Sequence, residues 1–310
     1  MSKNALITEI HKFYLKLFNK KQYQELKHKL KEFENYENYK KIIDPALKKI
    51  SESIKSGKNL SFLHSGHLGD IIYSLPLIKE ISKNSKCIFY LEVNKKMPKE
   101  ASDLGHPFGR YFLSENAAFK LMPLIKKQKY ISNVQVYNGE KIDINLNLFR
   151  NLPINFNIDC IRWYFHLTGV HANLLDPSIE VDPHETIKNR IVIMRSLRRQ
   201  NRMISYKFLN NYESPLFVGL KDEYEELKYE IDNLEHYDCS DFYELASIIK
   251  SSKIFIGNLS FGYALAESIK VKRLLESGPN FPLVYPNGTN AYDFYFQNHF
   301  EELFNKLYKN

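Results

Sequence analysis

The stretch Leu60-Ser-Phe-Leu-His-Ser-Gly-His-Leu-Gly-Asp70-Ile-Ile-Tyr-Ser-Leu-Pro-Leu-Ile-Lys-Glu-Ile81 carries most of the information about the fold. Residues 60–63 form the short, mainly apolar run of a parallel strand. A turn with two glycines follows, and apolar residues then recur at helical spacing as far as Ile81. We therefore expect Asp70 at the start of a helix, at the sheet edge where open α/β sheets bind ligands.

Two interpretations of this turn are open. In one, Asp70 is a helix N-cap, and Gly66 and Gly69 only allow the chain to turn. In the other, the turn holds a ligand and Asp70 takes part in chemistry. The spacing is not G-x-G-x-x-G, so a dinucleotide-binding fingerprint is not supported. Pro76 falls inside the predicted helix, where it removes a hydrogen bond and predicts a kink.

Length and composition describe a globular protein. The 310 residues are enough for two domains, and 44% hydrophobic with 26% charged residues is ordinary. No apolar run approaches the ~20 residues that span a bilayer, and the N-terminus lacks the apolar core of a secretory signal. Cys87, Cys160 and Cys239 are widely spaced and form no metal-binding pattern. We expect a cytoplasmic protein, with the inner face of the membrane as an alternative location.

Residues 1–58 form a basic helical extension. They hold 14 Lys against 7 acidic residues, so they carry +7 of the net charge of +8. Because the remainder is nearly neutral, we expect no nucleic-acid partner. Apolar stripes at helical spacing and an Asp44-Pro45 helix start leave two interpretations open. Residues 1–57 touch a membrane surface or a protein partner, or they pack on the next domain; interspersed Glu favours packing.

The rest of the chain alternates strand and helix, which predicts α/β architecture with parallel sheets and crossover helices. We expect two Rossmann-like domains, 59–172 and 173–310, with a linker over 173–189. Strands are predicted over 87–93, 131–137, 142–148, 190–194, 215–220, 253–257 and 273–276. Helices are predicted over 117–125, 241–250 and 261–269.

A second chemical cluster follows two strands of the second domain. Arg195-Ser-Leu-Arg-Arg-Gln-Asn-Arg202 supplies guanidinium groups that grip phosphate through paired hydrogen bonds. Gly257-Asn-Leu-Ser-Phe-Gly262 is a strand-to-helix turn whose free N–H groups favour an anion. Each segment also has a purely structural interpretation: the arginine run is a solvated loop, and the strand-to-helix turn is only a capped turn. Glu267 either receives a ribose hydroxyl or is merely exposed.

Gly66-His-Leu-Gly-Asp70-Ile-Ile-Tyr-Ser-Leu-Pro76 resembles the N-terminal motif of the heptosyltransferase family of glycosyltransferases, in which a Gly-Asp pair precedes a proline by six residues. The stretch from Asp241 to Asn258 is similar to that family's second conserved region. It departs at the following turn, where Asn258-Leu-Ser260 stands in place of Asp-[Thr/Ser]-Gly. The resemblance covers roughly residues 60–290 and leaves the extension unmatched. No D-x-D triplet occurs.

The resemblance implies a two-Rossmann, GT-B type glycosyltransferase whose active site lies in a cleft between an acceptor domain and a nucleotide-sugar domain. It implies inversion at the anomeric carbon, with no metal and no cofactor. The implied substrates are a nucleotide-diphosphate sugar and a glycan or lipid-glycan acceptor. Asp70 matches the family's proposed catalytic base, and the helix N-terminus is expected to lower its pKa and keep it ionised.

The other implied site residues surround this base. The acceptor-side loop holds Gly66, Gly69 and His64. His64 and His67 flank the site, and each either contacts the acceptor, shares the base role or is structural. The implied donor-binding residues, which offset charge on the departing diphosphate, are Arg195, Arg198, Arg199, Gly257, Asn258, Ser260 and Glu267.

Two other classes of function are open. One is a non-catalytic nucleotide-sugar-binding or assembly protein on the same fold, which the altered turn at Asn258 keeps in view. The other is a nucleotide-sugar epimerase or hydrolase. Acceptor-dependent release of a nucleoside diphosphate separates a transferase from both.

Overall fold

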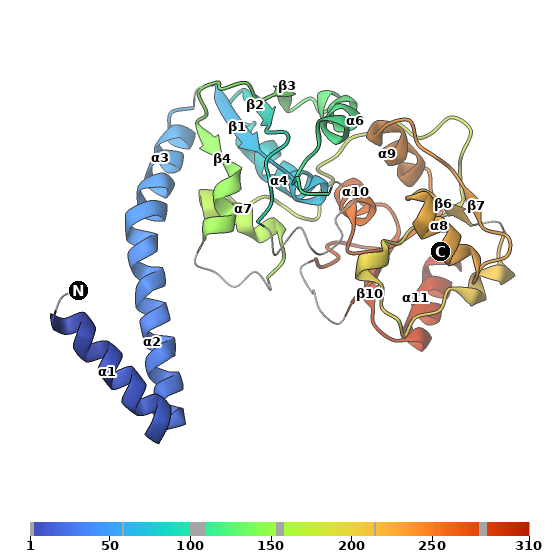
Figure 1. The fold of residues 1–310 in the computed structure, drawn as a ribbon. Coiled ribbons are helices and arrows are strands. Elements are labelled where there is room, and N and C mark those ends of the chain that lie inside the picture. Colours follow the sequence, from blue (N-terminus) through green and yellow to red (C-terminus); the bar gives the residue numbers. More distant parts are fainter. Residues whose placement is uncertain are drawn as a thin grey trace.

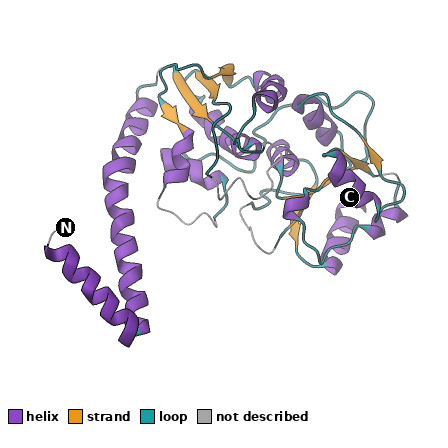
Figure 2. Cartoon of the chain, in the orientation of Figure 1, coloured by secondary structure: helices purple, strands orange, loops and turns teal. Residues whose placement is uncertain are grey.

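Two parallel β-sheets with flanking helices form the body of the chain (Figures 1 and 2). The computed structural model describes residues 3–57, 59–98, 109–152, 158–213, 215–278 and 284–309. The first sheet has the order β3-β2-β1-β4 and the second the order β10-β9-β8-β5-β6-β7. This confirms two Rossmann-like halves. The strands are β1 Leu60–His64, β2 Cys87–Leu91, β3 Ile131–Val136, β4 Ile144–Asn145, β5 Ile191–Met194, β6 Leu216–Phe217, β7 Glu235–His236, β8 Ile254–Asn258, β9 Arg273–Glu276 and β10 Ala291–Phe294.

The helices of the body agree in part with the sequence pattern. They are α4 Leu68–Ile81, α6 Glu115–Lys126, α7 Ile161–Thr168, α8 Lys221–Lys228, α9 Phe242–Lys250, α10 Phe261–Ile269 and α11 Gln297–Lys309. The strand predicted over 142–148 is wrong for most of its length. Only β4 is extended, and a 3₁₀ helix, η2 Leu146–Asn151, follows it. The prediction also missed β10 and α11, which extend the second half beyond β9.

Helix α4 continues through Pro76 to Ile81. A proline in a helix interior costs about 3 kcal/mol. Every residue from Ile71 to Ile78 is buried, and full burial of one Leu or Ile side chain contributes about 1.5–3 kcal/mol. Several such side chains outweigh the proline, so the helix is not interrupted.

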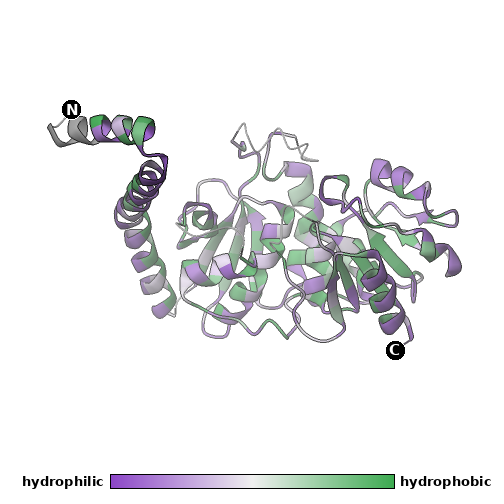
Figure 3. Cartoon of the chain, turned by 90° about the horizontal axis from the view of Figure 1, so that it is seen from below, coloured by the Kyte–Doolittle hydropathy of each residue, from purple (hydrophilic) through white to green (hydrophobic). Residues whose placement is uncertain are grey.

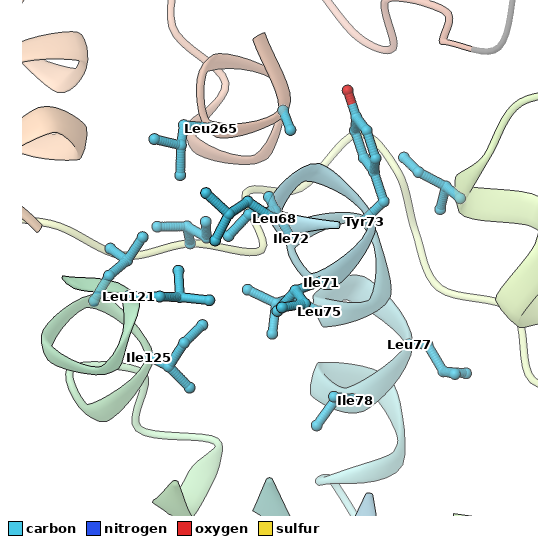
Figure 4. Packing of buried hydrophobic residues seen from close by; sticks show 14 of the residues in the cluster. Leu68, Ile71, Ile72, Tyr73, Leu75, Leu77, Ile78, Leu121, Ile125 and Leu265 are labelled. Carbon is cyan, nitrogen blue, oxygen red and sulfur yellow. The ribbon is translucent and has the colours of Figure 1, made fainter. Parts of the chain in front are cut away.

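The two halves pack against each other through helices. α4 contacts α10, and α6 contacts α9. Leu68 and Ile72 of α4 lie next to Leu265 of α10 (Figure 4). These residues belong to a single apolar core that runs from the first sheet to the second. Because α4 and α10 each begin at the carboxyl end of a strand, their contact brings the two strand ends together.

The N-terminal extension consists of α1 Lys3–Phe18, α2 Lys20–Asn38, a π turn Tyr39–Ile43 and α3 Asp44–Lys55. The sequence predicted that Asp44-Pro45 starts a new helix. This prediction is wrong, because the residues before Asp44 are already helical. A π turn accommodates Pro45, which has no N–H to donate. None of the described helices is long and apolar enough to cross a membrane.

The prediction that this extension packs on the first half is right for α3 only. Ile43 and Ile50 are buried in the main core, where α3 contacts α7. α2 buries none of its residues, and α1 and α2 project away from the body (Figure 1).

Candidate active site

A cavity of about 410 Å³ lies where the two halves meet. Helices α4 and α7 of the first half and α8, α9 and α10 of the second begin at its wall. In parallel sheets, helices start at the carboxyl ends of strands, and their free N–H groups favour an anion. The turn before α4 and the loop after β5 both line this cavity, as the sequence predicted.

Asp70 is the third residue of α4 and lines the cavity. The N-cap is His67, so the interpretation of Asp70 as the cap is wrong, although its carboxylate accepts the His67 backbone N–H at 3.2 Å. Burial raises the pKa of Asp70, and Arg150 and the His67 N–H oppose this effect. The expected lowering of the pKa is therefore wrong in direction. A higher pKa makes a carboxylate a stronger general base.

Arg150 is the neighbour of Asp70 that the sequence did not reveal. Its Nη2 lies 3.6 Å from Asp70 Oδ2. The guanidinium stacks on Phe112 and Phe149, 4.3 and 4.4 Å from the ring centroids. It also donates to the carbonyl of Gly66 and to Asn147 Oδ1. These contacts fix a positive charge beside the carboxylate, inside the cavity wall.

Gly66 is required by the local backbone. Its φ is +93°, and a Cβ there would lie 2.9 Å from the carbonyl oxygen of Phe112. Gly69 lines the cavity, and a Cβ there would meet no atom closer than 3.9 Å. Only Gly66 is therefore needed for the turn itself.

The two histidines of the motif have different environments. His64 is fully buried. Its Nε2 lies 2.8 Å from the Tyr164 hydroxyl, and that hydroxyl donates to the carbonyl of Asp70 at 2.9 Å. Burial holds the pKa of His64 well below its usual value. His64 is not in the cavity wall, so its placement supports the structural interpretation.

His67 lines the cavity. Burial, with Arg150, Arg198 and Arg199 nearby, lowers its pKa to about 4. The ring is therefore neutral near pH 7.

Two of the three predicted arginines face the cavity. Arg198 and Arg199, in the 3₁₀ helix η3 Leu197–Arg199, belong to its wall. Arg195 does not. Its guanidinium donates from Nε and Nη2 to the buried Glu276 carboxylate at 2.7 and 3.1 Å, and it stacks on the ring of Tyr206. Arg195 thus forms a buried ion pair of the second half, and its prediction as a donor ligand is corrected.

Of the predicted donor ligands at the end of β8 and in the turn after it, some lie outside the cavity wall and one lies in it. Gly257 and Asn258 are buried. The Asn258 amide accepts the Ser196 N–H at 2.9 Å and donates to the Ser196 carbonyl at 2.7 Å. Asn258 therefore holds the loop that carries Arg198, rather than facing the cavity. Ser260 does line the cavity, and its hydroxyl has no hydrogen-bond partner among the described residues.

Glu267 lies away from the cavity wall. It is 1% exposed and forms ion pairs with Arg273 and Lys270. Neither of its predicted roles, a ribose ligand or an exposed side chain, is correct. Its carboxylate neutralises the buried Arg273 and the half-buried Lys270 inside the second half.

Most of the apolar lining of the cavity and one of its carboxylates carry no recognisable pattern in the sequence. Glu223 of α8 lines the cavity, and burial raises its pKa. The Tyr73 hydroxyl has no hydrogen-bond partner among the described residues. Isolated aromatic residues carry no pattern that reveals such a wall. The aromatic residues of the lining are Tyr73, Phe149, Trp163, Phe242 and Phe261. Across the described ranges, no three His, Cys, Asp or Glu side chains gather as metal ligands.

Comparison with known proteins identifies the fold. No family model and no curated protein matches the sequence. Among solved structures, a glycosyl transferase of family 9 from Veillonella parvula matches with a TM-score of 0.53 and 14% identity, over 81% of this chain and 89% of that one. The E. coli ADP-heptose LPS heptosyltransferase II matches with a TM-score of 0.51 and 8% identity, over 81% and 98%. The chain has the fold of these glycosyltransferases. The resemblance seen in the Gly66–Pro76 motif is thus confirmed at the level of the fold.

Proposed function

We propose that this chain is an inverting, metal-independent glycosyltransferase. It moves a sugar from a nucleotide-diphosphate sugar to a glycan or lipid-glycan acceptor. The observation that carries the proposal is a carboxylate with a raised pKa, Asp70, in the same cavity as Arg198 and Arg199. A base and a pair of cations in one cavity suit an acceptor hydroxyl and a departing diphosphate.

The residues divide the reaction between the two halves. The acceptor oxygen attacks the anomeric carbon as its proton passes to Asp70, and the bond to the diphosphate oxygen breaks on the opposite face. Attack opposite the leaving group inverts the configuration. Arg198, Arg199 and the N-termini of α8, α9 and α10 stabilise the negative charge that develops on the diphosphate.

Other cavity residues support binding. The free hydroxyls of Ser260 and Tyr73 are suited to sugar or phosphate oxygens. Phe242 and Phe261, whose ring centroids lie 4.7 Å apart, offer an apolar wall to a nucleobase. Neutral His67, which lines the same cavity, is the proposed hydrogen-bond partner of the acceptor beside Asp70.

The test is acceptor-dependent release of nucleoside diphosphate by the full chain. A thermal-shift screen of nucleotide sugars comes first, since a ligand at 100 times its Kd adds about 2.7 kcal/mol to stability. ADP-heptose is the first donor to try, because heptosyltransferase II is named for it. Release that an acceptor accelerates, in excess chelator, is the expected result. Donor binding without acceptor-dependent release would favour the non-catalytic binding protein instead.

A further inference from the structure

One face of α1 is apolar and exposed. Ile10, Phe13, Tyr14, Leu17 and Phe18 recur at helical spacing and are between 57% and 72% exposed. We call these five residues the tip face. Leu15 lies outside it and is buried, 6% exposed, where α1 contacts α2. The hairpin therefore holds together through Leu15 and leaves the tip face uncovered.

The arm presents the tip face far from the core. The arm consists of α1 and α2, which extend away from both sheets (Figure 1). Figure 3 shows hydrophobic as well as hydrophilic residues on both helices. Phe13, Tyr14 and Phe18 give the face three aromatic rings, and Tyr14 and Phe18 lie 5.0 Å apart. Phe and Leu on one face of a cationic helix are typical of helices that lie in the membrane interface.

Charge concentrates at the same end of the arm. From Glu9 to Lys21 there are four lysines and one glutamate, a net charge of +3. From Gln22 to Asn38 there are three lysines and four glutamates, a net charge of −1. Within α1 and α2 the net positive charge therefore lies beside the tip face, and residues 39–58, next to the body, carry a further net charge of +4.

We propose that α1 lies in the surface of an anionic lipid membrane, with the tip face among the acyl chains and the neighbouring lysines at the headgroups. Anionic headgroups attract a charge of +3. A second copy of the chain would bring two such charges together, so the charge pattern disfavours pairing of two tip faces. α2 and α3 then connect the membrane to the body.

The test is co-sedimentation of the full chain with vesicles of phosphatidylcholine alone or mixed equally with phosphatidylglycerol. The chain should sediment with the anionic vesicles, and less at high salt. The double variant Phe13→Glu/Leu17→Glu should lose at least about tenfold in vesicle affinity. Lys20→Gln/Lys21→Gln should weaken the salt-dependent part of binding. Tyr229→Glu is the matched control, because Tyr229 is 87% exposed on the body.

All substituted residues are exposed, so melting temperatures should be unchanged and loss of binding cannot reflect unfolding. Vesicle binding that the tip-face variant leaves intact would overturn the proposal. A lack of vesicle binding at low salt would also overturn the proposal. A dimer in sedimentation velocity that Phe13→Glu/Leu17→Glu dissociates would then show that the tip face pairs two copies of the chain. Transfer to a soluble acceptor is a separate measurement, and its failure would bear on the proposed function alone.

Discussion

Arg150 Nη2 lies 3.6 Å from Asp70 Oδ2, so the proposed base has a fixed cation beside it. Burial raises the Asp70 pKa, and Arg150 limits that rise. The pair thus sets the pH range in which the carboxylate is ionised and able to accept a proton.

Replacing Arg150 should move the pH dependence of transfer. In Arg150→Gln the opposing charge is lost, so the Asp70 pKa rises further and the acidic limb of the kcat profile moves to higher pH. At a pH below that limb, each pH unit by which the limb moves lowers kcat about tenfold. Arg150→Lys keeps a cation and should retain most of the wild-type profile. An unshifted limb in Arg150→Gln would mean that another group titrates.

Asp70→Asn should lower the rate of transfer by about 10²–10⁴-fold, the usual contribution of a general base. Donor affinity should stay near wild type, since the amide oxygen still accepts the His67 N–H. The readouts are single-turnover kinetics and donor titration. Asp241→Asn, at the N-cap of α9, is a matched control that preserves a capping oxygen. Near-normal turnover in Asp70→Asn would leave this residue only a structural role.

Arg198 and Arg199 should behave differently from Arg195. Alanine at either cavity residue should weaken donor binding by about 1.5–3 kcal/mol, as for a hydrogen bond to a charged group. Arg195→Ala should instead destabilise the fold by about 3–5 kcal/mol, because it leaves the Glu276 carboxylate buried without its cation. Donor titration and denaturant unfolding of the three variants separate the effects. Normal donor affinity in both cavity variants would contradict the proposed diphosphate site.

Asp159 should make stability depend on pH. Burial raises its pKa to about 6, above an unfolded value of about 3.9. The folded state therefore binds the proton more tightly, and the stability that this confers is present below the unfolded pKa and lost as pH rises through 6. Asp159→Asn should accordingly stabilise the protein by about 1–3 kcal/mol at pH 7–8 and give no gain near pH 4.

Urea unfolding across that pH range measures this effect. Asp232→Asn, at an exposed position, should leave the pH dependence of stability as it is in the wild type. An equal gain from Asp159→Asn at every pH would show that ionisation of Asp159 is not the cause.

Truncation should separate α1 and α2 from α3. Removing residues 1–38 should leave the melting temperature and transfer to a soluble acceptor near wild type, because α2 buries no residue. Removing residues 1–57 also deletes Ile43 and Ile50 from the core. This truncation should lower the melting temperature, because each buried Ile contributes about 1.5–3 kcal/mol to stability. Calorimetry and a transfer assay compare the two truncations. A folded 1–38 truncation without activity would place the arm in the active site.

Local patterns in the sequence were enough for the two α/β halves, for the strand–turn–helix around Asp70 and for the helical extension. Apolar periodicity and glycine placement depend on neighbouring residues, so they can be read along the chain. The same reasoning failed at residues 142–148, where alternation predicts a strand but only β4 is extended. Side-chain packing, not periodicity, turns the following residues into the 3₁₀ helix that carries Arg150.

The roles of the charged residues depended on contacts between distant segments. The arginine cluster after β5 is visible in the sequence, but the sequence does not show that Glu276, far along the chain, pairs with Arg195. Glu267 likewise forms ion pairs with Arg273 and Lys270. A carboxylate or guanidinium in the interior must find an opposite charge, because desolvating it alone is too costly. The sequence by itself therefore determined the two halves and the position of Asp70 at a sheet edge. Only the tertiary structure decided which charges neutralise one another and which remain at the cavity.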